Sequence, residues 1–258
     1  MRVDAYLDRM RYDGPTNPTA ETLRRLHRAH MMSVPFENLD IHLGVPIVLS
    51  VPVFYEKIAA RRRGGYCYEL NGLFAWLLAE LGFRVALLSA RVTTAGQLGA
   101  EFDHLLILVE HDLRWIADVG FGDSSLEPLR IEAGRVEDHD GYSIAGNGDT
   151  WTMQRRRDGV PKPEYVFSMT PRRLNEFDSR NVFQQTSPES HFTQKSICSL
   201  ATPTGRISLS GRTLIVTSEG RREEREIESA ADYGHILADE FGFELGRAEI
   251  ERLMIRAA

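Results

Sequence analysis

The stretch from Arg61 to Leu81, RRRGGYCYELNGLFAWLLAEL, constrains the chain most, because it places a cysteine where a buried helix is predicted to begin. After Cys67, apolar residues recur at spacings of three and four, the period of one helical face, until Gly82 offers an end. A helix of this kind has to bury that face, so the rest of the chain must build a core around it. The apolar residues of the face are Leu70, Leu73, Phe74, Leu77, Leu78 and Leu81.

The position of Cys67 at the first turn of this helix supports two interpretations. The free N–H groups and the helix dipole favour an anion there, so we expect the thiol to lose its proton more readily than a free thiol. Gly64 and Gly65, just upstream, allow tight backbone geometry and close approach of another molecule. A free cysteine is, however, commonly a small buried apolar residue. The stretch alone leaves open whether Cys67 is a nucleophile or a packing residue.

Composition and charge narrow the class of protein. A net charge of −6 and a pI near 5.8 argue against a nucleic-acid-binding protein, which would present a basic face. No apolar run approaches the length of a membrane span, and the first ten residues carry charges where a secretory signal would be apolar. Two cysteines, Cys67 and Cys198, cannot form a disulfide framework. We therefore expect a cytoplasmic protein with no membrane or nucleic-acid partner.

The hydrophobic periodicity changes from helical to strand-like after Gly82, and this change predicts a domain boundary. Strands dominate to about residue 170, with hairpin turns expected at Asn147-Gly148 and Asp158-Gly159. Such a series of strands has to close or be covered, so a small barrel or curled sheet is expected. Further strands follow residue 190, and a helix is predicted to open at Ser229 and end at Gly242.

His104 is the best candidate for a base that serves Cys67, because a carboxylate can be placed beside it. If the loop between its strand and the next is Glu110 to Asp112, paired residue numbers sum to 222, and His104 lies directly opposite Asp118. One face of the hairpin is then apolar, and the two polar residues share the other. A carboxylate beside an imidazole orients the ring and stabilises its protonated form, although the two side chains could also form a purely structural cross-strand pair. The apolar face comprises Leu105, Ile107, Val109, Trp115, Ala117 and Val119.

The segment SVPFENLDIHLG, from Ser33 to Gly44, mixes apolar and charged residues in a predicted loop. We expect Phe36 to line a pocket and Glu37 to pair with Arg63, which would steady the loop before Cys67. The alternative is a buried connection whose polar side chains satisfy only its own backbone. His27 and His30 stand three residues apart on a predicted helix, but no further ligands at zinc spacing lie near them, and we expect no metal site.

Several motifs, taken together in this order, resemble those of the arylamine N-acetyltransferases. They are PFENLD at Pro35 to Asp40, RGGYCYELNGLF at Arg63 to Phe74, HLLILV beginning at His104, DVGFG at Asp118 to Gly122, and NVFQQTSPESHF at Asn181 to Phe192. The resemblance implies an α+β multidomain fold with a papain-like Cys-His-Asp triad. A helical bundle over residues 1–83 would carry the nucleophile, a β-barrel over 84–190 the histidine and aspartate, and 191–258 would form an α/β lid.

The resemblance also implies the chemistry and the residues that perform it. Acetyl-CoA would be the co-substrate, without a metal, and an acetyl group would pass through a thioester on Cys67 to an arylamine, hydrazine or N-hydroxyarylamine. Cys67 would be the nucleophile, His104 the base and Asp118 its orienting partner. The substrate-binding residues would be Phe36, Val92, Gly120 and Phe121, with Glu37 and Arg63 in structural support.

Three rival interpretations remain at this point. The same triad hydrolyses amides or thioesters if water replaces the amine. A non-catalytic binder could keep the fold with an inert cysteine. A zinc site built from Cys67, His104 and Asp118 is weaker, because the spacings match no zinc pattern.

Overall fold

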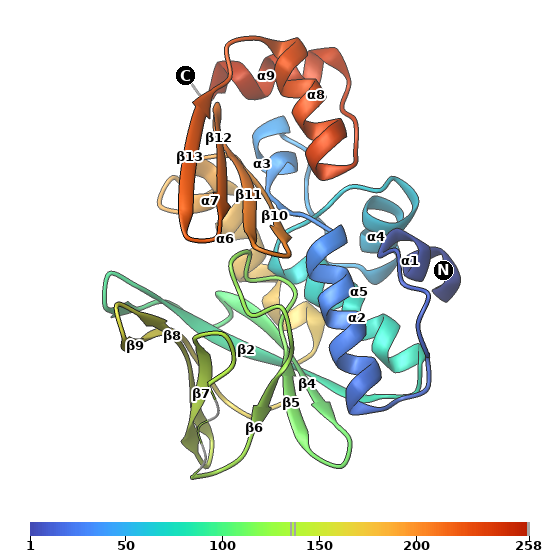
Figure 1. Cartoon of the computed structure of the whole chain (residues 1–258), viewed down its shortest axis with the longest axis vertical. Helices are drawn as coiled ribbons and strands as arrows, with labels where there is room; N and C mark the ends of the chain where they lie inside the picture. Colours follow the sequence, from blue (N-terminus) through green and yellow to red (C-terminus); the bar gives the residue numbers. More distant parts are fainter. Residues whose placement is uncertain (135, 137, 257–258) are drawn as a thin grey trace.

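The structure, a computed structural model, describes residues 1–134, 136 and 138–256. The N-terminal third folds into helices, drawn in blue and cyan on the right of Figure 1. Thr19 caps the second helix by accepting the backbone N–H of Thr22, the role that its side chain predicts. The predicted helix after Cys67 is present. The N-terminal elements are α1 (Val3–Arg9), α2 (Ala20–Ser33), α3 (Leu39–Leu43), α4 (Val51–Tyr55), the π-helical turn η1 (Glu56–Ala60) and α5 (Cys67–Glu80).

The middle of the chain forms a strongly curled sheet, green to yellow at the lower left of Figure 1. In the described part of the chain it has eight strands in the order β6-β5-β4-β2-β9-β8-β7, with β3 paired to β2. The expected mixture of helices and a barrel-like sheet is confirmed. The strands are β2 (Arg84–Thr94), β3 (Gln97–Leu98), β4 (His104–Glu110), β5 (Arg114–Ala117), β6 (Leu129–Ile131), β7 (Tyr142–Asn147), β8 (Thr150–Arg157) and β9 (Val160–Phe167).

The two faces of the curled sheet bury different cores. One face of β4 and β5 packs on the helices around α5, and the opposite face, including Leu106, Leu108 and Ile116, fills the inside of the curl. The alternation predicted from the sequence is therefore confirmed, because all six residues of the predicted apolar face lie in the helical core. These six are Leu105, Ile107, Val109, Trp115, Ala117 and Val119.

A second sheet lies at the top of Figure 1 with two helices beside it. Its order is β1-β10-β11-β12-β13, so Phe36 and Glu37 from the N-terminal third pair with Ser199 and Cys198. Ser229 caps α8 and Gly242 ends it in the left-handed conformation, as predicted. The elements are β1 (Phe36–Glu37), β10 (Ile197–Thr202), β11 (Gly205–Ser210), β12 (Thr213–Ser218), β13 (Arg221–Glu226), α8 (Ala230–Phe241) and α9 (Arg247–Arg256).

The segment between the two sheets packs on the helical core. It contains the 3₁₀ turn η2 (Leu174–Phe177), α6 (Asp178–Thr186) and α7 (His191–Gln194). Phe177 is fully buried among residues of the N-terminal helices. This segment packs on the helical core, and β1 from the N-terminal third pairs with β10 of the second sheet. The expected domain borders after residues 83 and 190 therefore stay a prediction.

The two expected hairpin turns differ in outcome. Asp158 and Gly159 form the turn between β8 and β9 with φ of 52° and 78°, a conformation that these residue types tolerate. The prediction at Asn147-Gly148 is displaced by one residue, because Asn147 pairs with Thr150 and the turn is Gly148-Asp149. Asn147 keeps its place in the ladder, so the turn begins one residue later.

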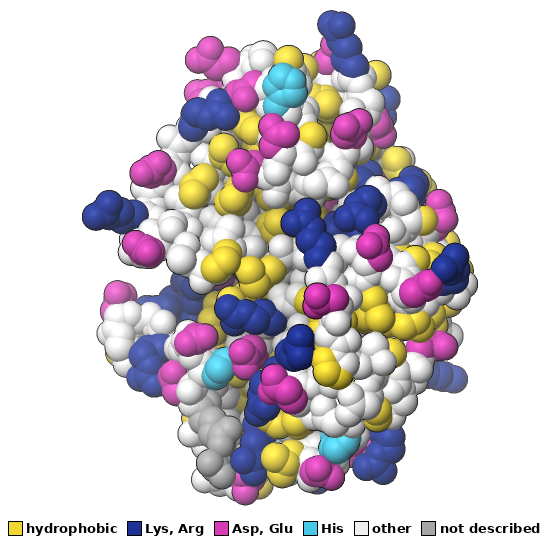
Figure 2. Space-filling model, turned by 45° about the vertical axis from the view of Figure 1, so that its right-hand side comes forward, with side chains coloured by type: hydrophobic (Ala, Val, Ile, Leu, Met, Phe, Trp, Pro, Cys, Tyr) yellow, Lys and Arg dark blue, Asp and Glu magenta, His cyan; other side chains and the backbone are white. Residues whose placement is uncertain are grey.

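Figure 2 shows acidic and basic side chains interspersed over one face of the molecule. Among the described residues, no helix is both long enough and apolar enough to span a bilayer.

Position 64 requires a glycine, because a neighbouring segment of the same chain leaves no room for a side chain there. A Cβ at this position would lie 2.0 Å from the carbonyl oxygen of Pro35 and 2.8 Å from Cγ of Glu37. The contact arises because Gly65 is bound to this segment, donating to Pro35 O and accepting from Glu37 N at 2.8 Å. What approaches the glycines closely is therefore the loop that carries Phe36.

We expect Gly64→Ala to destabilise the fold by about 3 kcal/mol, because backbone has to move to relieve the overlap. The measurement is the free energy of unfolding in urea. Gly234→Ala is the matched control, since its Cβ would meet only the flexible end of Ile250, and it should stay within about 1 kcal/mol of the wild type. Equal stabilities for both variants would contradict the packing described.

Candidate active site

Cys67 is the first residue of α5 and is 3% exposed. The start of the helix is fixed by Glu69, whose carboxylate accepts the backbone N–H of Tyr66 at 3.1 Å. Gly120 packs directly on it: a Cβ at Gly120 would lie 2.9 Å from Cα of Cys67. The cysteine is therefore held between the helical region and the segment that follows β5.

His104 and Asp118 are paired, but not by the predicted register. Nε2 of His104 lies 2.9 Å from Oδ2 of Asp118, and both side chains are buried. In the hairpin Glu110 pairs with Arg114, so paired numbers sum to 224 and the loop is His111–Leu113. The predicted sum of 222 is wrong by two residues. A shift of two keeps each side chain on its face, so the pair still forms between residues that are not directly opposite.

The carboxylate of Asp118 accepts hydrogen bonds from four groups. Besides His104, they are Asn71 Nδ2 and the Tyr165 hydroxyl, each at 2.9 Å, and the backbone N–H of Gly120 at 3.1 Å. Burial acts to raise the pKa of Asp118, but His104, Asn71 and Tyr165 together hold it below its usual value. Asp118 is therefore ionised, and its charge is directed at the imidazole.

Asn71 is a supporting residue that was not predicted from the sequence. Its Nδ2 also donates to the carbonyl of Leu105 at 2.6 Å, and its Oδ1 accepts the N–H of Val119 at 2.9 Å. One amide thus ties α5 to β4 and to the segment after β5. The available signal was an amide four residues after Cys67, one helical turn along the same face of a mostly apolar helix. Tyr165 lies far away in sequence and gave no comparable signal.

His27 holds the backbone of Asp118 in place through a hydrogen bond. Its Nε2 accepts the backbone N–H of Asp118 at 3.1 Å, and its Nδ1 lies 2.9 Å from the carbonyl of Leu126. Since one nitrogen accepts and the other faces a carbonyl, the ring is neutral with the proton on Nδ1. Burial lowers the pKa of His27 from 6.5 to about 4.

One cavity of about 330 Å³ contains Cys67, His104 and all four predicted substrate-binding residues. Phe121 packs against the imidazole with the ring centres 5.1 Å apart. The opposite wall comes from α6, α7 and the residues between them, which the sequence did not predict as a wall. The predicted residues of the cavity are Phe36, Val92, Gly120 and Phe121, and the additional wall comprises Arg180, Phe183, Gln184, Glu189, Ser190, His191 and Phe192.

The pKa of the Cys67 thiol is raised, whereas a lowered pKa was expected. Burial raises its pKa, the charge of Asp118 raises it further, and backbone hydrogen bonding with Leu105 and Tyr68 lowers it by less. The expectation of a thiol more acidic than a free one is therefore wrong for the isolated group, because desolvation outweighs the helix terminus. A thiolate here needs a neighbouring cation to form.

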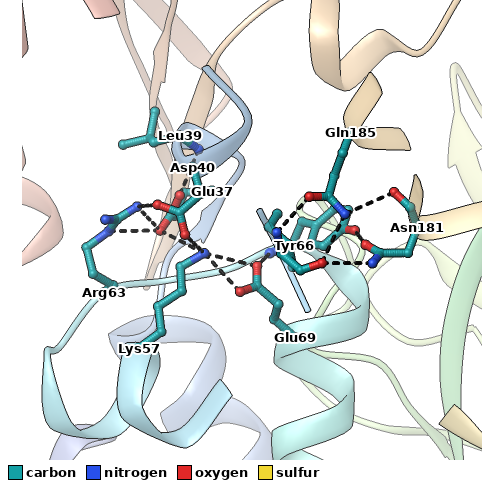
Figure 3. A network of polar contacts seen from close by, with 10 residues as sticks. Glu37, Leu39, Asp40, Lys57, Arg63, Tyr66, Glu69, Asn181 and Gln185 are labelled. Atoms are coloured by element: carbon teal, nitrogen blue, oxygen red, sulfur yellow. Dashed lines mark hydrogen bonds and ion pairs between the residues drawn. The ribbon is translucent and has the colours of Figure 1, made fainter. Parts of the chain in front are cut away.

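Glu37 and Arg63 belong to a buried cluster of five charged side chains (Figure 3). Arg63 contacts Glu37 at 2.8 Å and Asp40 at 2.9 Å, so the expected Glu37–Arg63 pair is present. Lys57 reaches Asp40 at 2.8 Å and Glu69 at 2.9 Å. Burial raises the pKa of Glu69 to about 7, with Lys57 opposing. The cluster links the loop that carries Phe36 to the first turn of α5.

The described residues contain no group of three or more His, Cys, Asp or Glu side chains arranged to hold a metal ion. His27 uses both ring nitrogens in contacts with the backbone. His30 is buried against the rings of Tyr6 and Phe74.

Comparison with known proteins gives matches along most of the chain. A family model described as N-acetyltransferase matches residues 19–250. An arylamine N-acetyltransferase of Mycolicibacterium smegmatis is 37% identical over 256 residues, covering 95% of this chain and 93% of that protein. The pineal gland isozyme of Gallus gallus arylamine N-acetyltransferase is 34% identical, covering 93% and 90%.

Solved structures of similar proteins superpose on the chain over nearly its whole length. The arylamine N-acetyltransferase from Salmonella typhimurium has a TM-score of 0.91 at 32% identity, covering 98% of this chain and 97% of that one. The Mycobacterium marinum arylamine N-acetyltransferase in complex with CoA has a TM-score of 0.88 at 34% identity, covering 99% and 98%.

We expect His27 to contribute a loss of stability as the pH is lowered from 6.5 to 4. The unfolded chain takes up a proton near pH 6.5 but the folded His27 only near 4, so the unfolded state binds more protons in this window. The shift of 2.5 pH units corresponds to about 3 kcal/mol. His30, whose pKa burial also lowers, acts in the same direction. Glu69, whose pKa burial raises to about 7, acts in the opposite direction.

The measurement is the free energy of unfolding in urea at several pH values, for the wild type and His27→Gln. Replacing His27 removes one titrating group, so the free energy of unfolding should rise less, or fall, between pH 4 and 6.5 compared with the wild type, whatever the variant's absolute stability. An unchanged slope would show that His27 takes up its proton equally in both states.

Proposed function

The chain belongs to the arylamine N-acetyltransferase family, and on that premise we propose that Cys67, His104 and Asp118 carry the transfer. The protein is an acyltransferase that moves an acetyl group from acetyl-CoA to the nitrogen of arylamines. The observation that supports the residue assignment best is the shared cavity, which is lined both by the buried thiol of Cys67 and by an imidazole that is paired with an ionised carboxylate.

In the first half-reaction, His104 takes the proton of Cys67, and the thiolate attacks the carbonyl carbon of the acetyl thioester. The pKa of the isolated thiol is raised, so ionisation requires this coupled transfer. The imidazolium that forms is stabilised by Asp118, and the N–H groups at the start of α5 face the developing oxyanion. The carbon–sulfur bond to coenzyme A then breaks, and the departing thiolate takes the proton from His104.

In the second half-reaction, the amine attacks the carbonyl carbon of the acetylated Cys67. His104 accepts the proton that the nitrogen loses, the bond to Sγ of Cys67 breaks, and the amide leaves. Both substrates use the same cavity in turn, which gives ping-pong kinetics. The aromatic side chains of Phe36, Phe121 and Phe192 around this cavity suit a flat aromatic ring.

The acceptor is proposed to bind against Phe36, Val92, Gly120 and Phe121. The range of acceptors is proposed to include arylhydrazines and N-hydroxyarylamines as well as arylamines. Glu37 and Arg63 are proposed to support the site through the buried charge cluster. The lid proposed for residues 191–258 would contribute His191 and Phe192 to the cavity wall. A cytoplasmic location would keep both free thiols, Cys67 and Cys198, reduced.

We expect acetyl-CoA alone to add one acetyl group to the protein, on Cys67. Mass spectrometry of the intact protein and of its peptides measures the label, and adding an arylamine such as anisidine should remove it faster than water does. Cys67→Ala should abolish labelling and activity.

Cys198→Ala is the matched control, because Cys198 is fully buried in β10 and lies outside the cavity. This variant should still become acetylated. Label lost to water as fast as to the amine would favour the rival hydrolase, and label on a residue other than Cys67 would contradict the proposal.

A further inference from the structure

A second ion pair stands in the wall of the active-site cavity. Arg180 on α6 lies 2.5 Å from Asp103, with both its Nε and its Nη2 on the same carboxylate oxygen, Oδ1. Asp103 is the residue before His104 and is 8% exposed. Both side chains line the cavity that contains Cys67. The mechanism above uses neither of them.

Asp103 is held in place from its other side as well. A Cβ on Gly99 would lie 2.1 Å from Oδ2 of Asp103, so the carboxylate packs closely on the backbone of the loop before β4. Gly99 in turn donates its N–H to the carbonyl of Val92 at 2.8 Å. The carboxylate therefore cannot turn away into solvent, and its charge stays beside the thiol.

The helix that carries Arg180 is fixed on its other side by amide side chains, visible in Figure 3. Asn181 accepts the hydroxyl of Tyr66, the residue before Cys67, and donates to the carbonyl of Ile47 at 2.9 Å. Gln185, one turn later, donates to the same carbonyl at 3.0 Å and accepts the N–H of Ile47 at 2.7 Å. Arg180 is thus presented to Asp103 from a helix anchored beside the nucleophile.

The Arg180–Asp103 pair matters for the ionisation of Cys67 because of the other charged groups around the cavity. Besides Cys67, the ionisable side chains of the cavity wall are Asp103, His104, Arg180, Glu189 and His191. Asp118 is not part of the wall and acts through its hydrogen bond with His104. The nearby phenols are engaged, since Tyr66 donates to Asn181, Tyr68 to Phe102 O and Tyr165 to Asp118. Glu69 is bound to Lys57, away from the cavity. Among the described residues that line the cavity, Arg180 is the one arginine or lysine.

We propose that Arg180 is a positioning residue for acetyl transfer, which neutralises Asp103 beside Cys67 and so allows the thiolate–imidazolium pair to form. The proposal rests on the triad proposed above. Two carboxylates flank His104: Asp118 is directed at the imidazole, and Asp103 is directed at Arg180. Without the guanidinium, the buried carboxylate of Asp103 would lose its cationic partner in the wall of the same cavity as the thiol.

The direction of the effect on Cys67 follows from Coulomb's law. A nearby negative charge disfavours a thiolate. Burial and then the charge of Asp118 raise the pKa of Cys67 most, and the charge of Asp103 raises it further by a smaller amount. A guanidinium on the same carboxylate oxygen removes most of this field. Loss of Arg180 should therefore move the reactivity of the thiol to higher pH, which loss of packing alone would not do.

The test is the pH dependence of Cys67 alkylation by iodoacetamide, with acetyl transfer measured in parallel. In Arg180→Gln we expect the midpoint to rise by about one pH unit, and the alkylation rate at pH 7 to fall about tenfold. Arg180→Lys keeps the positive charge and should stay within about threefold of the wild type. Arg173→Gln, at a side chain 84% exposed on the preceding turn, is the matched control and should not change.

The double variant Asp103→Asn with Arg180→Gln distinguishes charge from structure. It removes both charges, so the midpoint should return to that of the wild type and the rate to within about threefold. An unshifted midpoint in Arg180→Gln, or a double variant as slow as the single one, would overturn the proposal. If Arg180→Gln does not fold, the double variant is compared with Asp103→Asn alone. The guanidinium left without Asp103 should lower the midpoint of Asp103→Asn, so the double variant should lie higher, and equal midpoints in those two would overturn the proposal.

The outcome is separable from that of the triad. Alkylation reports the thiol without turnover, and Cys67→Ala identifies the signal that belongs to Cys67. If Cys67→Ala abolishes acetyl transfer while Arg180→Gln leaves the alkylation midpoint unchanged, the proposed function stands and the role of Arg180 is refuted.

Discussion

The buried carboxylate of Asp118 is the interaction on which the site depends. A charge taken out of water has to be compensated by hydrogen bonds and by an opposite charge, and this one accepts from four donors. The donors come from β4, from α5, from β9 and from the segment after β5. Satisfying one carboxylate therefore brings the helical region and the curled sheet together where the cavity lies.

A second group of buried charges, the cluster that contains Lys57 and Arg63, positions the start of α5 rather than the imidazole. Lys57 and Arg63 are surrounded by three carboxylates, one of which accepts the N–H before the nucleophile. Burial acts to lower the pKa of Lys57, but the carboxylates outweigh it and hold the pKa above its usual value. These groups fix where α5 begins and where the loop with Phe36 lies. The nucleophile is thus set by one electrostatic cluster and its base by another.

The sequence was sufficient for the helix after Cys67, for the hairpin that carries His104 and for the residues with distinctive chemistry, but it did not predict the helices α6 and α7. The periodicity after Cys67 predicted α5, and the alternation around His104 predicted the two faces of the hairpin. The register was wrong by two residues, because a three-residue loop can begin at Glu110 or at His111 with the same parity. A register shift of two residues leaves every side chain on the same face of the sheet. The His104–Asp118 pair was therefore predicted despite the error.

What the sequence did not predict depends on distant packing. Tyr165, 47 residues after Asp118, meets it only because β9 pairs with β2, and the wall from α6 needs the anchoring by Asn181. The acidity of Cys67 was predicted from its place at a helix start. The opposite direction holds because burial, which a single sequence does not give, is the larger effect.

The state of the His104 ring tests the central claim most directly. Nitrogen-15 NMR of histidine-labelled protein, with His104→Gln for assignment, shows which ring nitrogen carries a proton. The structure predicts a proton on Nε2 held by Asp118, leaving Nδ1 for the thiol, and a loss of that strongly hydrogen-bonded signal in Asp118→Asn. A ring in the free enzyme whose Nε2 carries no proton would contradict the account.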